Sequence, residues 1–408
     1  PADPPTLPPP TALEVALPPD PWDPSLGLPE ILAAAHQVWI GRDVTAQQAY
    51  VDRARAELTN VPAGPGRTAS DILVHVAAGR LLTTAGAYDG PQLDHTRKRL
   101  RASLSALDPA GQPPPAWAWL WEQGVIRGDL AGARVAARQL SVAAGHHPDR
   151  RLQVAGQAAR GIAAFHMGEL GMARDALAPL VALDLPAGAE GTDLGVPLLD
   201  QPVVAARVYS ALTLCMAGDD ADAAGMSRQA AAAASRVGTD AGFALALFGH
   251  VMVSVLSGRR ERAAGAGGRL TSRDIGWNIR PWSILTAVVR GWAGSDPTRP
   301  ETAAQLAGAL SRLDHVGLGM FRPVIVALLA TNYRAAGMPV EALAAVRDGL
   351  RHTSTGGERF FDAELYRMQG ELLVDLGQDE DGAARESFLQ SVSIARHQGV
   401  RGSRLSPR

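Results

Sequence analysis

Glycines recur along this chain at a nearly constant spacing, and this spacing constrains the fold more than any other feature. The step is 40 residues for Gly128–Gly168, Gly218–Gly258 and Gly337–Gly377, and 50 residues for Gly168–Gly218. An alanine follows five residues after five of these glycines, as Ala133, Ala173, Ala223, Ala263 and Ala342. Because glycine ends a helix and a small residue lets the next helix pack closely, the pattern predicts a repeated unit of two helices joined by a turn.

The last of these units shows the pattern most clearly. In the stretch Phe361–Leu376, apolar residues recur at helical spacing and form a single stripe on one face; they are Leu365, Met368, Leu372, Leu373 and Leu376. Gly377 ends this helix, and a second helix is predicted over Gly382–His397. Neither helix can bury its stripe alone, so each unit needs a neighbouring unit to pack against.

Helical periodicity begins at Leu28 and continues almost to the end of the chain. It predicts an all-α, right-handed α-α superhelix of about nine helix pairs, over residues 28–58, 70–107, 116–143, 151–183, 203–236, 241–270, 281–314, 321–353 and 361–398. The loop Leu185–Pro202 is the longest irregular stretch inside the array, so we expect it to contact a partner or to carry function.

The final unit also carries a family resemblance. Gly370, Gly377, Ala384, Phe388 and Ser391 together resemble the tetratricopeptide repeat (TPR). The segments ERFFDAELYRMQGELL and SFLQSVSIARHQG are similar to the last repeats of large bacterial signalling regulators. Those regulators join an ATPase of the STAND or AAA type to a repeat array and include LuxR-type, maltose-activator-like and cyclase-linked proteins. The resemblance implies that the ATPase lies elsewhere in a parent chain, and that the array binds a protein or a small inducer.

Composition suggests three regions. Residues 1–28 hold ten prolines and form a Pro-rich arm or linker, residues 29–400 form the repeat solenoid, and residues 401–408 form a tail. The tail, RGSRLSPR, resembles the opening of a LuxR-type DNA-binding domain. The chain begins at Pro1 without Met, and we interpret this as processing or as a longer parent protein.

Charge and hydropathy limit the partners and the compartment. The net charge is −2, which does not favour direct binding to nucleic acid. The longest apolar run, Ala241–Ser257, is short for a membrane span and contains His250, so we interpret it as a buried repeat helix. The single cysteine, Cys215, excludes an internal disulfide and is expected to be a buried small side chain. A cytoplasmic protein with no membrane partner is expected.

Motifs that carry chemistry are missing. The sequence contains no P-loop, GxSxG, HExxH or CxxC motif, and His146–His147 are interpreted as part of a solvated turn. We therefore expect no catalytic residue, no metal ligand and no cofactor. The alternative is an enzyme on an α/α scaffold, which would need paired carboxylates facing a cavity. The only dense acidic runs, Asp219–Asp220 and Asp379–Asp381, fall in turns between helices.

Helical spacing also predicts which side chains face the concave groove of the superhelix. Counting back from each turn glycine gives the candidate binding residues, with Trp121 bordering the first stripe: Trp121, Glu122, Phe165, Leu212, Phe248, Met252, Arg334, Arg367 and Glu371. The middle of this wall is apolar and its C-terminal end is charged.

Each part of this wall has two interpretations. The apolar residues either form core in a tight superhelix or contact an occupant, which could be the Pro-rich arm, a partner helix or a ligand. The charged residues either orient a carboxylate or form an exposed ion-pair network, and Trp121 could simply pack between paired helices.

Recognition without reaction is the function that these features favour. The leading hypothesis is a non-enzymatic sensor or scaffold module of a bacterial transcriptional or signalling regulator. It would bind a protein segment, a neighbouring ATPase domain or a small inducer in the concave groove, and bias the packing of the parent protein. A freestanding protein–protein adaptor is the alternative.

Overall fold

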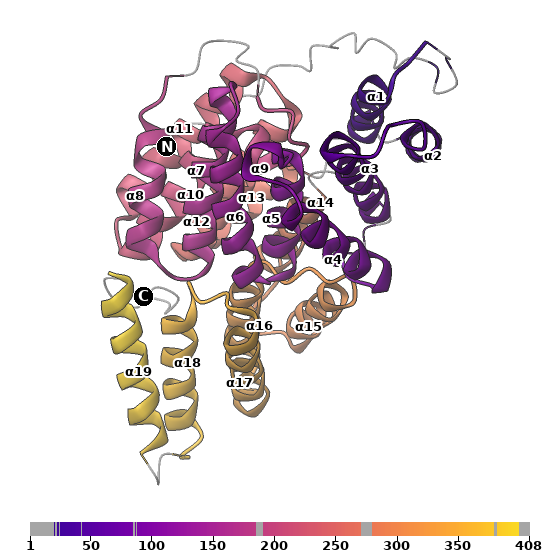
Figure 1. Cartoon of the computed structure of the whole chain (residues 1–408). Helices are drawn as coiled ribbons and strands as arrows, with labels where there is room; N and C mark the ends of the chain where they lie inside the picture. Colours follow the sequence, from indigo (N-terminus) through magenta and orange to yellow (C-terminus); the bar gives the residue numbers. More distant parts are fainter. Residues whose placement is uncertain are drawn as a thin grey trace.

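The computed structural model describes residues 20, 23, 25–41, 43–84, 86, 88–184, 191–270, 280–378 and 382–399 (Figure 1). Within these residues the chain is helical apart from turns and loops, and no strand occurs. Most of the predicted Pro-rich arm and all of the predicted tail lie outside the described residues. The predicted all-α fold is confirmed.

The described residues form nine helix pairs, as the helical periodicity predicts. The first four pairs are α1 Leu28–Gly41 with α2 Val44–Leu58, α3 Pro65–Thr84 with α4 Pro91–Ser105, α5 Pro114–Arg127 with α6 Leu130–Gly145, and α7 Arg150–His166 with α8 Leu170–Val181. The other five are α10 Pro202–Ala217 with α11 Asp220–Val237, α12 Asp240–Leu256 with α13 Arg260–Leu270, α14 Arg280–Ala293 with α15 Pro300–His315, α16 Arg322–Ala335 with α17 Pro339–Gly356, and α18 Asp362–Asp375 with α19 Ala383–Gln398. Two short helices lie between pairs, η1 Pro109–Gly111 and α9 Pro197–Asp200.

The turns follow the predicted chemistry. The turn glycines adopt the left-handed backbone conformation that glycine tolerates best, at Gly128, Gly168, Gly218, Gly258, Gly337 and Gly377. Within the third pair, a Cβ on Gly124 would come within 2.9 Å of Ala133, so small residues set the close approach of α5 and α6. The N-cap of α2 is Asp43, whose carboxylate accepts the Ala46 amide at 2.9 Å.

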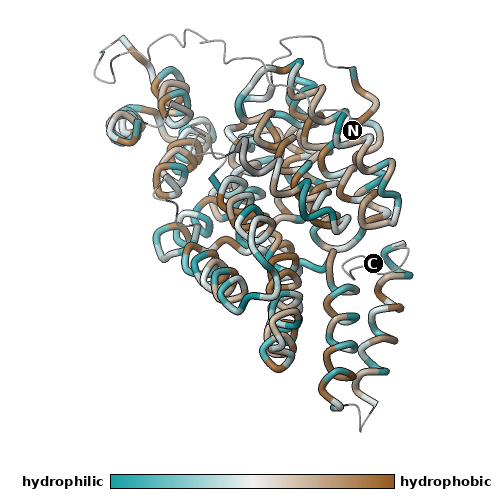
Figure 2. Tube along the Cα trace, turned by 180° about the vertical axis from the view of Figure 1, so that it is seen from behind, coloured by the Kyte–Doolittle hydropathy of each residue, from teal (hydrophilic) through white to brown (hydrophobic). Residues whose placement is uncertain are grey.

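The first helices of successive pairs line the inner face of the superhelix. Helix α10 packs against both α7 and α12, α12 packs against α14, and α3 packs against α5. The second helix of each pair lies outside its partner. Figure 2 shows apolar and polar residues alternating along these helices. Helix α12 holds the longest apolar run and is buried in the array, and none of the described helices is both long and apolar enough to span a membrane.

The superhelix turns tightly enough for its second turn to stack on its first. The amides of Gly319 and Met320, which precede α16, both donate to the carbonyl of Ile126 at the end of α5. The Arg359 amide, before α18, donates to the carbonyl of His166 at the end of α7 at 2.8 Å. The eighth pair thus meets the third, and the ninth meets the fourth. In Figure 1 helices α16 to α19 extend below α5 to α12.

Candidate functional site

A segment of the chain itself lies in the concave groove. Residues 191–201, called the insert below, connect toward α10 and contain α9, which packs against α7, α10 and α12. These are the first helices of three pairs, so the insert lies on the inner wall (Figure 1). Four of its apolar side chains are at most 1% exposed: Leu194, Val196, Leu198 and Leu199. The loop predicted to carry function is therefore folded inward at the described residues.

The insert is closed on itself by hydrogen bonds between its two ends. The Thr192 amide donates to the carbonyl of Asp200 at 3.2 Å, and the Thr192 hydroxyl donates to the Asp200 carboxylate at 3.1 Å. The same carboxylate accepts the Gly195 amide at 3.1 Å. Pro197 occupies the first turn of α9, where its missing N–H costs nothing. The insert therefore satisfies much of its own backbone before it contacts the wall.

Arg80 of α3 is the main polar contact between the wall and the insert. Its guanidinium donates to the carbonyl of Leu194 and, at 3.0 Å, to Nδ1 of His36 on α1. The same group lies 5.3 Å from the ring centre of Trp39, in cation–π geometry. Burial, followed by the charge of Arg80, lowers the pKa of His36 to about 3, so that ring is neutral and free to accept. Arg80 is thus oriented by α1 and directed at a backbone carbonyl.

Two acids share this buried environment with Arg80. Burial raises the pKa of Glu122, on α5, to about 8, although the nearby Arg80 acts in the opposite direction. Burial likewise raises the pKa of Asp200 to about 7, again opposed by Arg80. Within the described part of the chain, Glu122 has no hydrogen bond or ion pair. Ionisable groups with pKa values displaced toward neutrality are typical of functional sites, although structural networks also displace them.

The predicted groove residues fall into separate environments. Glu122 faces the cluster of Arg80 and Asp200, whereas Trp121 is fully buried and donates from Nε1 to the carbonyl of Ala159 at 3.1 Å, which joins α5 to α7. Three other apolar candidates are at most 1% exposed, namely Leu212, Phe248 and Met252. These positions form core in a tight superhelix, which is one of the two interpretations that the sequence leaves open.

The charged candidates lie in the second turn, on α16 and α18. Arg334 forms ion pairs with Glu371 at 2.7 Å and with Asp375 at 2.7 Å. Arg367 pairs with Glu364 at 2.6 Å and also with Glu371. The structure brings these three candidates together with further acids in one partly exposed network.

The remaining candidate, Phe165, belongs to the seam between the two turns. Its ring stacks on Phe360 with centroids 4.8 Å apart. Next to it, Nδ1 of the fully buried His166 lies 2.8 Å from Glu358, and Nε2 lies 3.0 Å from the Tyr209 hydroxyl. Sequence reasoning did not identify this polar cluster, nor Arg80 and His36. Weak sequence signals exist for two related residues: His166 lies two residues before the turn glycine Gly168, and Asp200 falls in the irregular loop.

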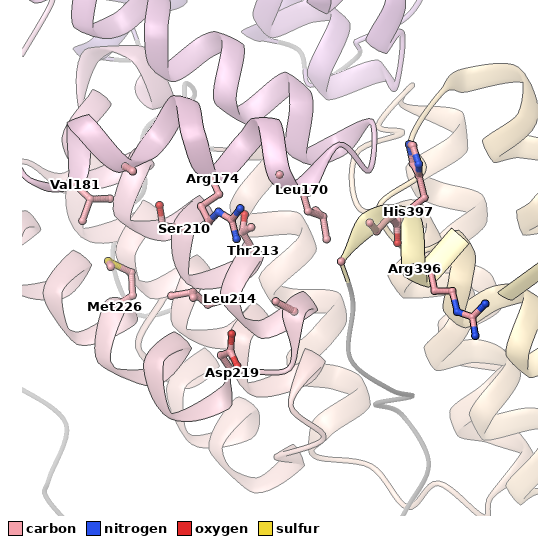
Figure 3. Close-up of a pocket in the computed structure, with 15 residues that line it drawn as sticks. Leu170, Arg174, Val181, Ser210, Thr213, Leu214, Asp219, Met226, Arg396 and His397 are labelled. Carbon is pink, nitrogen blue, oxygen red and sulfur yellow. The ribbon is translucent and has the colours of Figure 1, made fainter. Parts of the chain in front are cut away.

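Two surface hollows also occur on the described surface. A groove of about 430 Å³ runs between α8, α10 and α11 and the end of α19. In Figure 3, Leu170, Leu214 and Met226 are on one side of it and Arg396 and His397 on the other. A more polar hollow of about 680 Å³ lies at the seam, between Arg127, Glu169 and His352. No three His, Cys, Asp or Glu side chains are grouped as a metal site requires, among the residues described.

Comparison with known proteins supports the fold. No protein-family model matches the sequence, and no curated protein is similar to it. Among solved structures, the chain is similar to the crystal structure of a Rap protein complexed with Competence and Sporulation Factor, with a TM-score of 0.59. That match covers 91% of this chain and 98% of the other, at 8% sequence identity. The likeness at this identity is one of fold: a TPR-like superhelix of helix pairs.

Proposed function

We propose that the chain is a recognition module that binds a segment of another protein in the concave groove of its first superhelical turn. One observation carries this proposal: the groove already holds a polypeptide segment. The insert places four apolar side chains against the inner wall and gives one backbone carbonyl to Arg80. Apolar pockets combined with a donor aimed at the main chain are the usual means of peptide recognition.

The surroundings of the insert also suit recognition. Arg80 is held by His36 and Trp39 before any ligand arrives, and preorganised donors lose less entropy on binding. The buried aromatic and aliphatic wall supplies area, while Arg80 and Glu122 supply direction. The similar fold was solved with Competence and Sporulation Factor bound to it, which supports binding of a partner by this architecture.

We further propose that the module belongs to a bacterial signalling or transcriptional regulator of the cytoplasm. Its partner is a protein segment or a neighbouring ATPase domain of a parent chain, and a small inducer is a further ligand class. Binding shifts the packing of the parent protein because the ligand has different affinities for its two states. A freestanding adaptor would use the same groove without a parent ATPase.

Selection from a library of displayed 12-residue peptides tests whether the groove binds a protein segment. We expect selected peptides to bind the intact chain saturably in calorimetry. In a chain whose insert is loosened by Leu198→Ala with Leu199→Ala, Arg80→Met should lower their affinity at least tenfold. Arg347→Met, on the exposed face of α17, is the matched control and leaves affinity unchanged. The proposal fails if no peptide binds saturably, or if the two variants affect binding equally.

A further inference from the structure

We propose that the insert is an intramolecular ligand that a partner must displace, and that the displacing segment carries two adjacent apolar residues followed by an acid. Leu198, Leu199 and Asp200 supply this pattern in the insert. The inference rests on the proposed function, because it names the chemistry of the segment that the groove accepts. It also adds a form of regulation, since the unliganded groove is occupied by the chain itself.

The insert behaves as a ligand and not as an ordinary connection. Loops normally run over the surface, because a buried loop strands its polar backbone. Here the polar groups are satisfied internally: Thr192 bonds to Asp200, and Asp200 bonds to Gly195. The segment can therefore leave the wall as one unit without breaking these bonds.

The groove is built to be occupied. If the insert left and nothing replaced it, Arg80 would lose the Leu194 carbonyl while its Nε already has no partner. Glu122 would remain beside it without a hydrogen bond, and the apolar wall on α7, α10 and α12 would be uncovered. Uncovered apolar surface and unpaired buried donors are both unfavourable. Exchange of one occupant for another avoids both costs, so binding and displacement are coupled.

The acid in the pattern has a defined role. Asp200 closes the turn by accepting from Thr192 and Gly195, and its charge is attracted by Arg80. A competing segment with an acid in the same place can form the same closed turn and feel the same attraction. Replacing this carboxylate by an amide in a competing peptide should weaken its binding, although the apolar contacts remain.

A synthetic peptide of residues 191–202, GTDLGVPLLDQP, labelled with fluorescein, provides the direct test by anisotropy. Its host is the full chain in which Leu194, Val196, Leu198 and Leu199 are replaced by serine. We expect the peptide to bind this host at least tenfold more tightly than it binds the intact chain. A peptide with the Asp200→Asn change should bind at least fivefold more weakly, and a scrambled peptide should not bind.

Circular dichroism and a cooperative unfolding transition establish that the host is folded. Leu389→Ser with Val392→Ser, on the exposed face of α19, is the matched control and should not create binding. If the fourfold variant does not fold, Leu198→Ala with Leu199→Ala replaces it as host. Equal affinity for host and intact chain, or no binding to a folded host, overturns the inference.

Hydrogen exchange separates this inference from the proposed function. When the intact chain is saturated with a display-selected peptide, we expect amide exchange in the insert to accelerate at least tenfold. A selected peptide that binds and leaves insert exchange unchanged contradicts displacement, but leaves the groove as a recognition site. Failure to select any peptide contradicts the proposed function itself.

Discussion

His166 and Glu358, 192 residues apart in the sequence, share a hydrogen bond of 2.8 Å in which neither side chain is more than 3% exposed. The same Glu358 oxygen accepts the Phe321 amide at 2.8 Å, and the Tyr209 hydroxyl donates to the other nitrogen of His166 at 3.0 Å. Phe321 has a left-handed backbone, with φ of 57°, which is uncommon for a residue with a side chain. This cluster fastens the second turn of the superhelix to the first.

Replacing His166 by alanine should destabilise the chain strongly. The change leaves the buried Glu358 carboxyl without its side-chain partner, and stranding a buried hydrogen-bonding group costs about 1–3 kcal/mol. Urea unfolding measures the loss. Glu358→Gln should cost less, because the amide oxygen can still accept from Phe321. His397→Ala, exposed at the end of α19, is the control, and an effect of His166→Ala as small as that control would contradict a fastening role.

Stability should fall as the pH rises from 6.5 to 8.5. The folded pKa values of Glu122 and Asp200, about 8 and about 7, lie above their ordinary values of 4.5 and 3.8. Between each pair of values the folded chain holds a proton that the unfolded chain has released, so unfolding becomes easier with rising pH. His36 acts in the opposite sense, but only up to its ordinary value of 6.5. We expect a loss of roughly 2 kcal/mol over this range.

Urea unfolding at several pH values, compared with Glu122→Gln, checks this expectation. The variant carries no proton at this position to lose, so its stability should depend less on pH between 6.5 and 8.5. Glu341→Gln, on the exposed face of α17, should retain the full pH dependence. If the stability of the unmodified chain stays constant or rises between pH 6.5 and 8.5, burial does not hold these protons.

The small residues at helix crossings should be sensitive to a single added methyl group. A Cβ on Gly370 would come within 2.7 Å of the Phe388 ring, so Gly370→Ala forces α18 and α19 apart. Overpacking of this kind typically costs about 1–3 kcal/mol. Gly145→Ala, at the end of α6, meets no atom within 4 Å and should be neutral or slightly stabilising. If Gly370→Ala and Gly145→Ala change the melting temperature by the same amount, this account is wrong.

The sequence predicts local features of the fold well and long-range ones poorly. Gly128, Gly377 and the stripe that includes Leu365 act within one unit, so spacing alone locates the helix pairs. The contact between His166 and Glu358 depends on the pitch of the superhelix, which accumulates from small rotations across five pairs and leaves no pattern in the sequence. The tightness of the turn likewise decides that Phe248 is core.

The sequence likewise predicts some features of the candidate site and not others. Composition identifies residues 185–202 as an irregular loop, but it does not indicate whether the insert, residues 191–201, lies on the surface or in the groove. The position of the insert depends on Arg80, about 110 residues earlier in the sequence. Arg80 donates to a backbone carbonyl, which every residue has, so the contact leaves no pattern of side chains in the sequence. Glu122 was identified because helical spacing does report which face a residue occupies.

Arg334 and Arg367 contact the same Glu371, yet their removal should have different consequences. The Arg334 side chain is 43% exposed, and solvent screens its pairs with Glu371 and Asp375, so Arg334→Ala should cost about 1 kcal/mol or less. The Arg367 side chain is only 13% exposed and donates twice to Glu364, so Arg367→Ala should cost about 2 kcal/mol.

A double-mutant cycle of Arg334 with Glu371, measured in low and high salt, separates the contribution of this pair from the effects of each side chain alone. Because the pair is partly exposed, its coupling energy should shrink at high salt, whereas the cost of Arg367→Ala should change little. Equal salt dependence of the two would place both arginines in the same solvated network. A cost of Arg334→Ala well above 1 kcal/mol would instead mean that this network, and not apolar packing, holds α18 against α16.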